Sequence, residues 1–176
     1  MASRLFSKVS PAIWSSPRFR KVSAGAQISL FYLMTNAHVD STGCYRLPVG
    51  YACADTGQDA DTWQRHIGEL CEADLILVDE AAEYVLIRRW FKHNPPMSLD
   101  HLTGTKRRVA EIESDPLREA CEEELAQAEA ELLARLEAKA KDKPRGNPPS
   151  KRNVSDLVTG AGRHLMETGY MGGRGR

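Results

Sequence analysis

The chain has 176 residues, of which 41% are hydrophobic, 7% aromatic and 27% charged. This composition is typical of a globular protein with one main domain, and no stretch approaches the roughly 20 apolar residues of a membrane-spanning helix, which excludes an integral membrane protein. The basic N-terminus lacks the continuous apolar stretch of a secretory signal, so we expect an intracellular, cytoplasmic protein.

The charge is unevenly distributed, although 24 basic and 24 acidic side chains give a formal net charge of zero. Residues 1–39 contain five basic side chains and no acid, residues 97–138 contain eleven acids against five bases, and residues 139–176 contain nine bases against three acids. Two basic ends therefore flank an acidic stretch, which indicates a role for electrostatics that the total conceals.

The first 60 residues predict a short extended stretch, a turn that carries Trp14, and then two helices separated by a short strand. Ser23 is placed to cap a helix over about 24–38, which is apolar over most of its circumference and so is expected at the centre of a small domain. A short strand over 44–47 and a second helix over 48–54 follow.

The next part of the chain predicts a third helix and a β-hairpin. Asp61 is expected to cap the helix, which buries Trp63 and Leu70 and exposes the side that carries Gln64, Arg65 and His66. The β-rich segments 75–79 and 84–91 flank a polar loop, and Asn94 stops the second strand. The expected class is mostly α (α+β), with a winged helix-turn-helix domain over residues 1–96.

The rest of the chain predicts a helical extension over residues 97–142 and a flexible basic Pro/Gly-containing tail over 143–176. The extension contains a helix over 98–113 and a longer one that Asp115 caps, reaching about residue 141. The longer helix contains four residues at heptad spacing, which are Cys121, Leu125, Ala128 and Leu132. A weak coiled-coil seam and a solvated helix are equal alternatives for them. In the tail a helically spaced apolar set predicts a partner-binding helix: Val154, Leu157, Val158 and Leu165.

The sequence offers no enzyme motif. There is no phosphate-cradling glycine loop and no nucleophile elbow, and the four cysteines and five histidines have no zinc-ligand spacing, so we expect no catalytic residues, no metal and no cofactor. The three tryptophans lie within apolar patterns, which favours core packing over base stacking.

Several short motifs together resemble the N-terminal winged-helix domain of bacteriophage replisome-organiser proteins, whose architecture is shared by DnaD-like primosome proteins. The resemblance covers residues 7–96. It rests on Ser10–Trp14, Val22–Ala26 with Leu30-Phe31, Asp40–Gly43, Glu69–Ile76 and Trp90–Asn94. It implies binding to DNA, which we expect to be double-stranded, at a phage origin in a bacterial host cell and recruitment of a replicative helicase.

The candidate DNA-binding residues are the basic N-terminal side chains, the polar face of the third helix and the end of the hairpin: Arg4, Lys8, Arg18, Arg20, Lys21, Thr62, Gln64, Arg65, His66, Arg88, Arg89 and Lys92. The hairpin tip is acidic, as is the second half of the third helix, which disfavours direct reading of bases there. The alternatives are a protein-interaction or homo-oligomerisation module without strong DNA readout and a transcriptional regulator.

Overall fold

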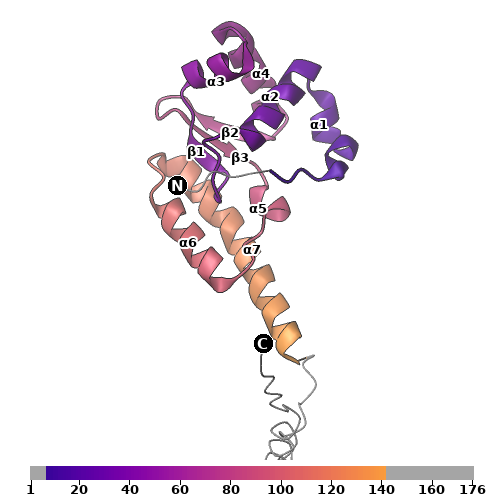
Figure 1. Cartoon of the computed structure of the whole chain (residues 1–176), viewed down its shortest axis with the longest axis vertical. Helices are drawn as coiled ribbons and strands as arrows, with labels where there is room; N and C mark the ends of the chain where they lie inside the picture. The colour runs from indigo at the N-terminus through magenta and orange to yellow at the C-terminus, as the bar shows by residue number, and fades with distance from the viewer. Residues whose placement is uncertain (1–6, 142–176) are drawn as a thin grey trace, which may run out of the picture. The chain divides into compact units, whose positions relative to one another are not determined.

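The computed structural model describes residues 7–141 (Figure 1). Its contacts divide the chain into two compact units, Met1–Glu137 and Ala138–Arg176. The predicted partner-binding residues Val154, Leu157, Val158 and Leu165 lie outside the described residues, as does Arg4. None of the helices within residues 7–141 is both long and apolar enough to cross a bilayer.

The N-terminal half of the described chain is helical apart from one short strand. A 3₁₀ turn η1 (Pro11–Ser15) and a short helix α1 (Pro17–Lys21) precede α2 (Ala24–Thr35), β1 (Cys44–Arg46), α3 (Val49–Thr56) and α4 (Ala60–Glu72). The Ser23 hydroxyl accepts a hydrogen bond from the Ala26 N–H at 3.2 Å, which confirms the predicted cap. The predicted cap of α4 is wrong, because Asp59 and not Asp61 accepts the Thr62 N–H.

The second half adds a hairpin and three helices: β2 (Ile76–Asp79), β3 (Tyr84–Ile87), α5 (Trp90–His93), α6 (Leu99–Ala110) and α7 (Asp115–Lys141). The strands form one antiparallel sheet in the order β1-β3-β2, with Leu86 of β3 opposite both Cys44 and Leu77. A mostly helical α+β structure is therefore present, as the sequence predicts.

The second strand is shorter than predicted. It ends at Ile87, the chain turns at Arg89 with a φ of 59°, and α5 then buries both Trp90 and Phe91. The predicted continuation of the strand through residue 91 is wrong, because the left-handed turn at Arg89 ends the extended conformation.

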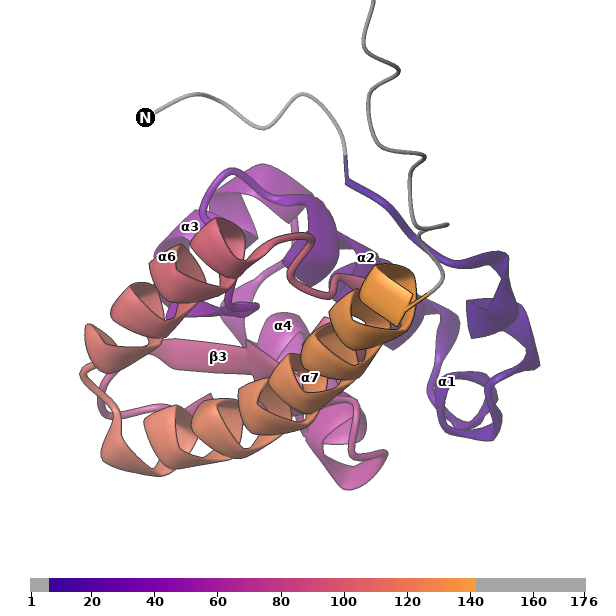
Figure 2. The ribbon, with the colours of Figure 1, turned by 90° about the horizontal axis from the view of Figure 1, so that it is seen from below.

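One continuous core extends from α1 to α7. The four heptad-spaced residues of α7 are all buried in the cluster that contains Leu30 of α2 and Leu86 of β3. Leu102 and Val109 of α6 belong to the same cluster. Figure 2, seen from below, shows α6 and α7 diverging from their connection, with β3 visible between them. Neither the coiled-coil seam nor the solvated helix describes these positions, because their apolar side covers the chain's own core.

This packing predicts opposite results for two neighbouring leucines of α7. Leu132 is 2% exposed and Leu133 is 43% exposed. Leu132→Ala should lower the free energy of unfolding by about 2–5 kcal/mol, because it removes buried methyl groups and leaves a cavity. Leu133→Ala should change it by less than about 0.5 kcal/mol. Urea titrations followed by circular dichroism measure both, and equal effects would mean that α7 does not close the core.

Candidate nucleic-acid interface

Two of the predicted cationic residues are held in ion pairs. Arg18 of α1 and Arg88, which follows β3, both bind the carboxylate of Asp74, at 3.0 and 3.2 Å. Arg88 also binds Glu124 of α7 at 2.6 Å. These contacts join three distant parts of the chain, so the two arginines have a structural role and only part of their charge faces solvent.

The remaining described cationic candidates make no ion pair within residues 7–141. All are exposed: Lys8, Arg20, Lys21, Arg65, Arg89 and Lys92. Five of them lie in the N-terminal segment or around α5, and only Arg65 lies on α4.

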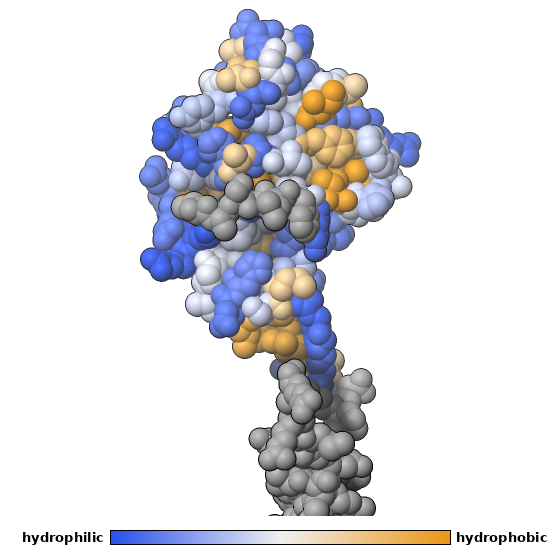
Figure 3. All heavy atoms as spheres, viewed as in Figure 1, coloured by the Kyte–Doolittle hydropathy of each residue, from blue (hydrophilic) through white to orange (hydrophobic). Residues whose placement is uncertain are grey.

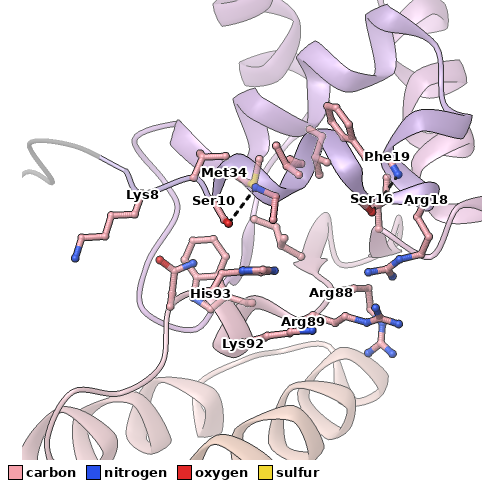
Figure 4. A pocket seen from close by; sticks show the side chains of 18 residues that line it. Lys8, Ser10, Ser16, Arg18, Phe19, Met34, Arg88, Arg89, Lys92 and His93 are labelled. Atoms are coloured by element: carbon pink, nitrogen blue, oxygen red, sulfur yellow. Dashed lines mark hydrogen bonds between the residues drawn. The ribbon is translucent and has the colours of Figure 1, made fainter.

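A pocket of about 260 Å³ brings the cations of the N-terminal segment and of α5 together. Figure 4 shows Arg18, Arg88 and Arg89 at one end, Lys92 and His93 on α5, and Lys8 at the other end. Buried apolar side chains that include Phe19, Leu30 and Trp90 form its floor, and no acidic side chain of the described chain lines it. We define this as the basic pocket, and it can attract an anionic group.

Arg89 lies on the rim of the basic pocket in an unfavourable backbone conformation. Its φ of 59° and ψ of 30° are left-handed, a region that glycine and asparagine adopt at lower cost. The backbone conformation therefore gives no reason for an arginine at this position. A function of the guanidinium side chain would give one.

His93 adds a titratable group to the basic pocket. Partial burial, together with the charge of Lys92, lowers the pKa of His93 below its usual value. At neutral pH the imidazole is therefore uncharged, with one nitrogen to donate and one to accept a hydrogen bond.

The structure does not place the predicted polar side of α4 as expected. His66 is only 9% exposed, and its Nδ1 lies 2.8 Å from Gln58 Oε1 and 3.3 Å from the Ser29 hydroxyl. A Cβ on Gly25 would lie 2.4 Å from the ring, so the glycine leaves the space that the imidazole fills. The predicted exposure of His66 is wrong because helical spacing alone does not reveal this space.

The rest of the α4 surface is poorly suited to phosphate. Thr62 is half-buried and donates to Asp59, so only Gln64 and Arg65 of the predicted set are exposed. Glu69 accepts hydrogen bonds from the Ser23 N–H at 2.7 Å and the Ser23 hydroxyl at 3.0 Å, which lower the pKa of its carboxyl and keep it charged.

A second hollow, of about 580 Å³, lies between α4 and the β2–β3 hairpin. Glu80 and Glu83 lie on its rim, and within residues 7–141 no lysine or arginine lines it. Asp79 at the hairpin tip accepts a hydrogen bond from Ser114 at 2.6 Å, so the tip is attached to the segment between α6 and α7. Glu83 is paired with Arg46 at 2.5 Å, whereas Lys8, Arg89 and Lys92 of the basic pocket make no ion pair within residues 7–141. Anions therefore favour the basic pocket.

The basic cluster in α6 serves the fold. Lys106 binds Glu129 at 2.7 Å, Arg108 binds Asp40 at 3.2 Å and Arg107 binds Glu111 at 3.5 Å. Each cation therefore has an acidic partner, and the cluster adds little net positive charge to the surface.

The three tryptophans differ in environment. Trp63 and Trp90 are each 4% exposed, which confirms their predicted place in the core. Trp14 is 62% exposed, so the prediction is wrong for it: η1 lies at the surface, where the ring contacts the rings of Phe19 and Phe31 at centroid distances of 5.4 and 5.9 Å. Figure 3 shows an apolar patch over α1 and α2, where Ile28 is also 62% exposed.

The described residues contain no cluster of side chains that could hold a metal ion. Cys44 and Cys121 are buried, and burial raises the pKa of both thiols, that of Cys44 to about 12. Both therefore remain protonated near neutral pH and act as small core residues.

The uncharged polar residues that line the basic pocket were not among the predicted DNA-binding residues: Ser10, Ser16, His93 and Asn94. The available signal was the run of Lys92, His93 and Asn94 directly after the predicted second strand. Comparisons of the chain with protein-family models, curated proteins and solved structures give no match.

Attachment of the hairpin tip predicts a shift in one carboxyl pKa. The Ser114 hydroxyl and the Ala82 N–H lower the pKa of Asp79. Ser114→Ala should raise this pKa toward the ordinary value, because the charged form loses a donor. A carboxyl whose pKa is lowered in the folded state stabilises that state fully above its pKa in the unfolded chain. The variant should therefore lose the full contribution at neutral pH, and the loss should shrink as the pH falls through the pKa of Asp79.

A carboxyl NMR titration measures this shift. Asp59 is an internal control, because its pKa is lowered mainly by Thr62, which the substitution leaves in place. An unchanged Asp79 pKa in the variant would contradict the attachment.

Proposed function

We propose that residues 7–96 form a winged-helix domain and that the chain binds DNA as a phage-type replication protein. The supporting observation is the succession of α2, β1, α3, α4 and the β2–β3 hairpin, which is the order of elements in that fold. The sequence resemblance to replisome-organiser proteins adds the expectation of origin binding and helicase recruitment.

The basic pocket and its surroundings carry the DNA-binding part of the proposal. Five exposed cations without ion pairs lie on the N-terminal segment and α5: Lys8, Arg20, Lys21, Arg89 and Lys92. The usual recognition surface of a winged helix, here α4 and the hairpin tip, is acidic. Phosphates are therefore expected on the N-terminal segment and α5, with α4 away from the DNA backbone.

Reversing two cations of the basic pocket tests this assignment. If all five contact phosphate, affinity should fall about 500-fold between 50 and 200 mM salt. Arg89→Glu with Lys92→Glu should weaken binding at low salt at least about tenfold and reduce the slope of log K against log salt by about 1.8, because two counterion-releasing contacts are lost.

The matched control is Arg65→Glu with Lys139→Glu, which changes the net charge equally at two exposed residues that do not line the basic pocket. Gel-shift titrations across a salt series measure both variants. Equal losses would mean that net charge rather than this surface binds DNA, and absence of binding by the native protein at low salt would overturn the proposal.

Self-association is a second candidate function, favoured by one observation. Trp14 and Ile28 are both 62% exposed, Ile28 precedes Phe31 by one helical turn, and Phe31 contacts Trp14. Rings and aliphatic side chains that remain this exposed on neighbouring elements are typical of a protein interface. A second copy of the chain would cover this apolar patch.

Light scattering over a concentration series tests self-association. Trp14→Ser with Ile28→Ser should raise the dimer dissociation constant at least about 100-fold, because each large apolar side chain contributes about 1.5–3 kcal/mol when buried. Tyr51→Ser is the control, since Tyr51 is 56% exposed and stacks on His38 away from the patch. A monomeric native protein at high concentration would exclude this function.

A further inference from the structure

We infer that the basic pocket receives one unstacked base of single-stranded DNA, with the neighbouring phosphates on Arg89, Lys92 and Lys8. This inference rests on the proposed function and deepens it, since it names the form of DNA that this surface selects. It depends on the size, depth, polarity and charge of the pocket.

Size and depth restrict the occupant. A volume of about 260 Å³ lies just below the range of about 300–1,000 Å³ that holds a drug-sized ligand, so the pocket accommodates one ring-sized group. Its floor lies below the surface, since Leu30 is 3%, Leu75 8% and Trp90 4% exposed. A base inside a duplex is stacked between neighbours and cannot reach this floor, whereas a base of a single strand can.

The polar groups around the apolar floor suit the edge of a base. Ser10 uses its oxygen to accept the Ala12 N–H at 3.3 Å, which leaves its hydroxyl proton to donate. His93 is uncharged at neutral pH, and the side-chain amide of Asn94 has no hydrogen-bond partner among residues 7–141. Base edges present both donors and acceptors, which these three side chains can match.

The same groups disfavour the main alternative, an acidic peptide with an apolar anchor. An aliphatic or phenyl side chain in the pocket would remove water from Ser10, His93 and Asn94 without replacing its hydrogen bonds, which is costly. A base offers the same apolar faces to Phe19 and Trp90 and also satisfies the polar rim.

The rim supplies charge where the backbone of a single strand would continue. Figure 4 shows Arg89 at one end of the pocket, Lys92 beside the floor and Lys8 at the opposite end. Because Arg18 and Arg88 already bind Asp74, the three unpaired cations are those available to phosphate. Cations at both ends suit a chain that enters and leaves, rather than one terminal phosphate.

Fluorescence anisotropy with full-length protein tests the inference through four probes: a short oligothymidylate, an oligomer of the same length with abasic sites in place of its bases, a duplex of the same length, and thymidine monophosphate. The oligothymidylate should bind about tenfold more tightly than the abasic oligomer or the duplex, because one base gains the pocket. The mononucleotide should displace it only at much higher concentration.

Substitution of Ala12, an exposed residue that lines the pocket, provides the matching variant. Ala12→Trp places a ring over the pocket and should remove the tenfold preference for bases while leaving duplex affinity unchanged. Ala54→Trp, at an exposed position of α3 outside the pocket, should change neither. His93→Ala with Asn94→Ala gives the same result by removing the polar rim, so the inference does not depend on how the tryptophan packs.

The outcomes separate the two proposals. If no DNA probe binds at low salt, the proposed function fails. If the abasic oligomer and the duplex bind as tightly as oligothymidylate, DNA binding stands and the base-binding pocket is overturned. Displacement by thymidine monophosphate at the concentration of the oligomer, or by a glutamate-rich peptide with one phenylalanine more readily than by oligothymidylate, also overturns it.

Discussion

The contact between Trp90 and the Ser41–Gly43 backbone is the interaction on which the rest of the structure depends. The indole N–H donates to the Ser41 carbonyl at 3.0 Å, and a Cβ on Gly43 would lie 2.3 Å from the ring, so only glycine allows this approach. Gly43 also has a φ of 68°, which favours glycine independently. The ring joins the loop before β1 to the helix after β3.

The surrounding loop connects the remaining elements to this contact. Asp40 binds Arg108 of α6, and the Cys121 thiol of α7 lies 3.8 Å from the Thr42 carbonyl oxygen. Since Trp90 is the first residue of α5, its position fixes where Arg89 and Lys92 project. The cations of the basic pocket are thus positioned by the core, which lowers the entropic cost of ordering these side chains when a ligand binds.

The sequence predicts the local features well and the long-range ones poorly. The Ser23 cap and the order of α2, β1, α3, α4 and the hairpin follow from short-range rules of capping and periodicity, whereas the short helices α1 and α5 were not predicted. The burial of His66 depends on Gly25, 41 positions away, and the neutralisation of Arg88 depends on Asp74 and Glu124, so no local pattern reveals either. The basic pocket likewise joins the N-terminal segment to α5, segments that only the tertiary structure brings together.

The closure of the core by α7 has a consequence for how the chain acquires its structure. The Cys121–Thr42 and Arg108–Asp40 contacts span 79 and 68 positions, and the last buried leucine of the cluster is Leu132. During synthesis, one apolar face of the sheet therefore stays exposed until α7 has left the ribosome. Loop closure over such separations slows folding, so the chain completes its fold only late in synthesis.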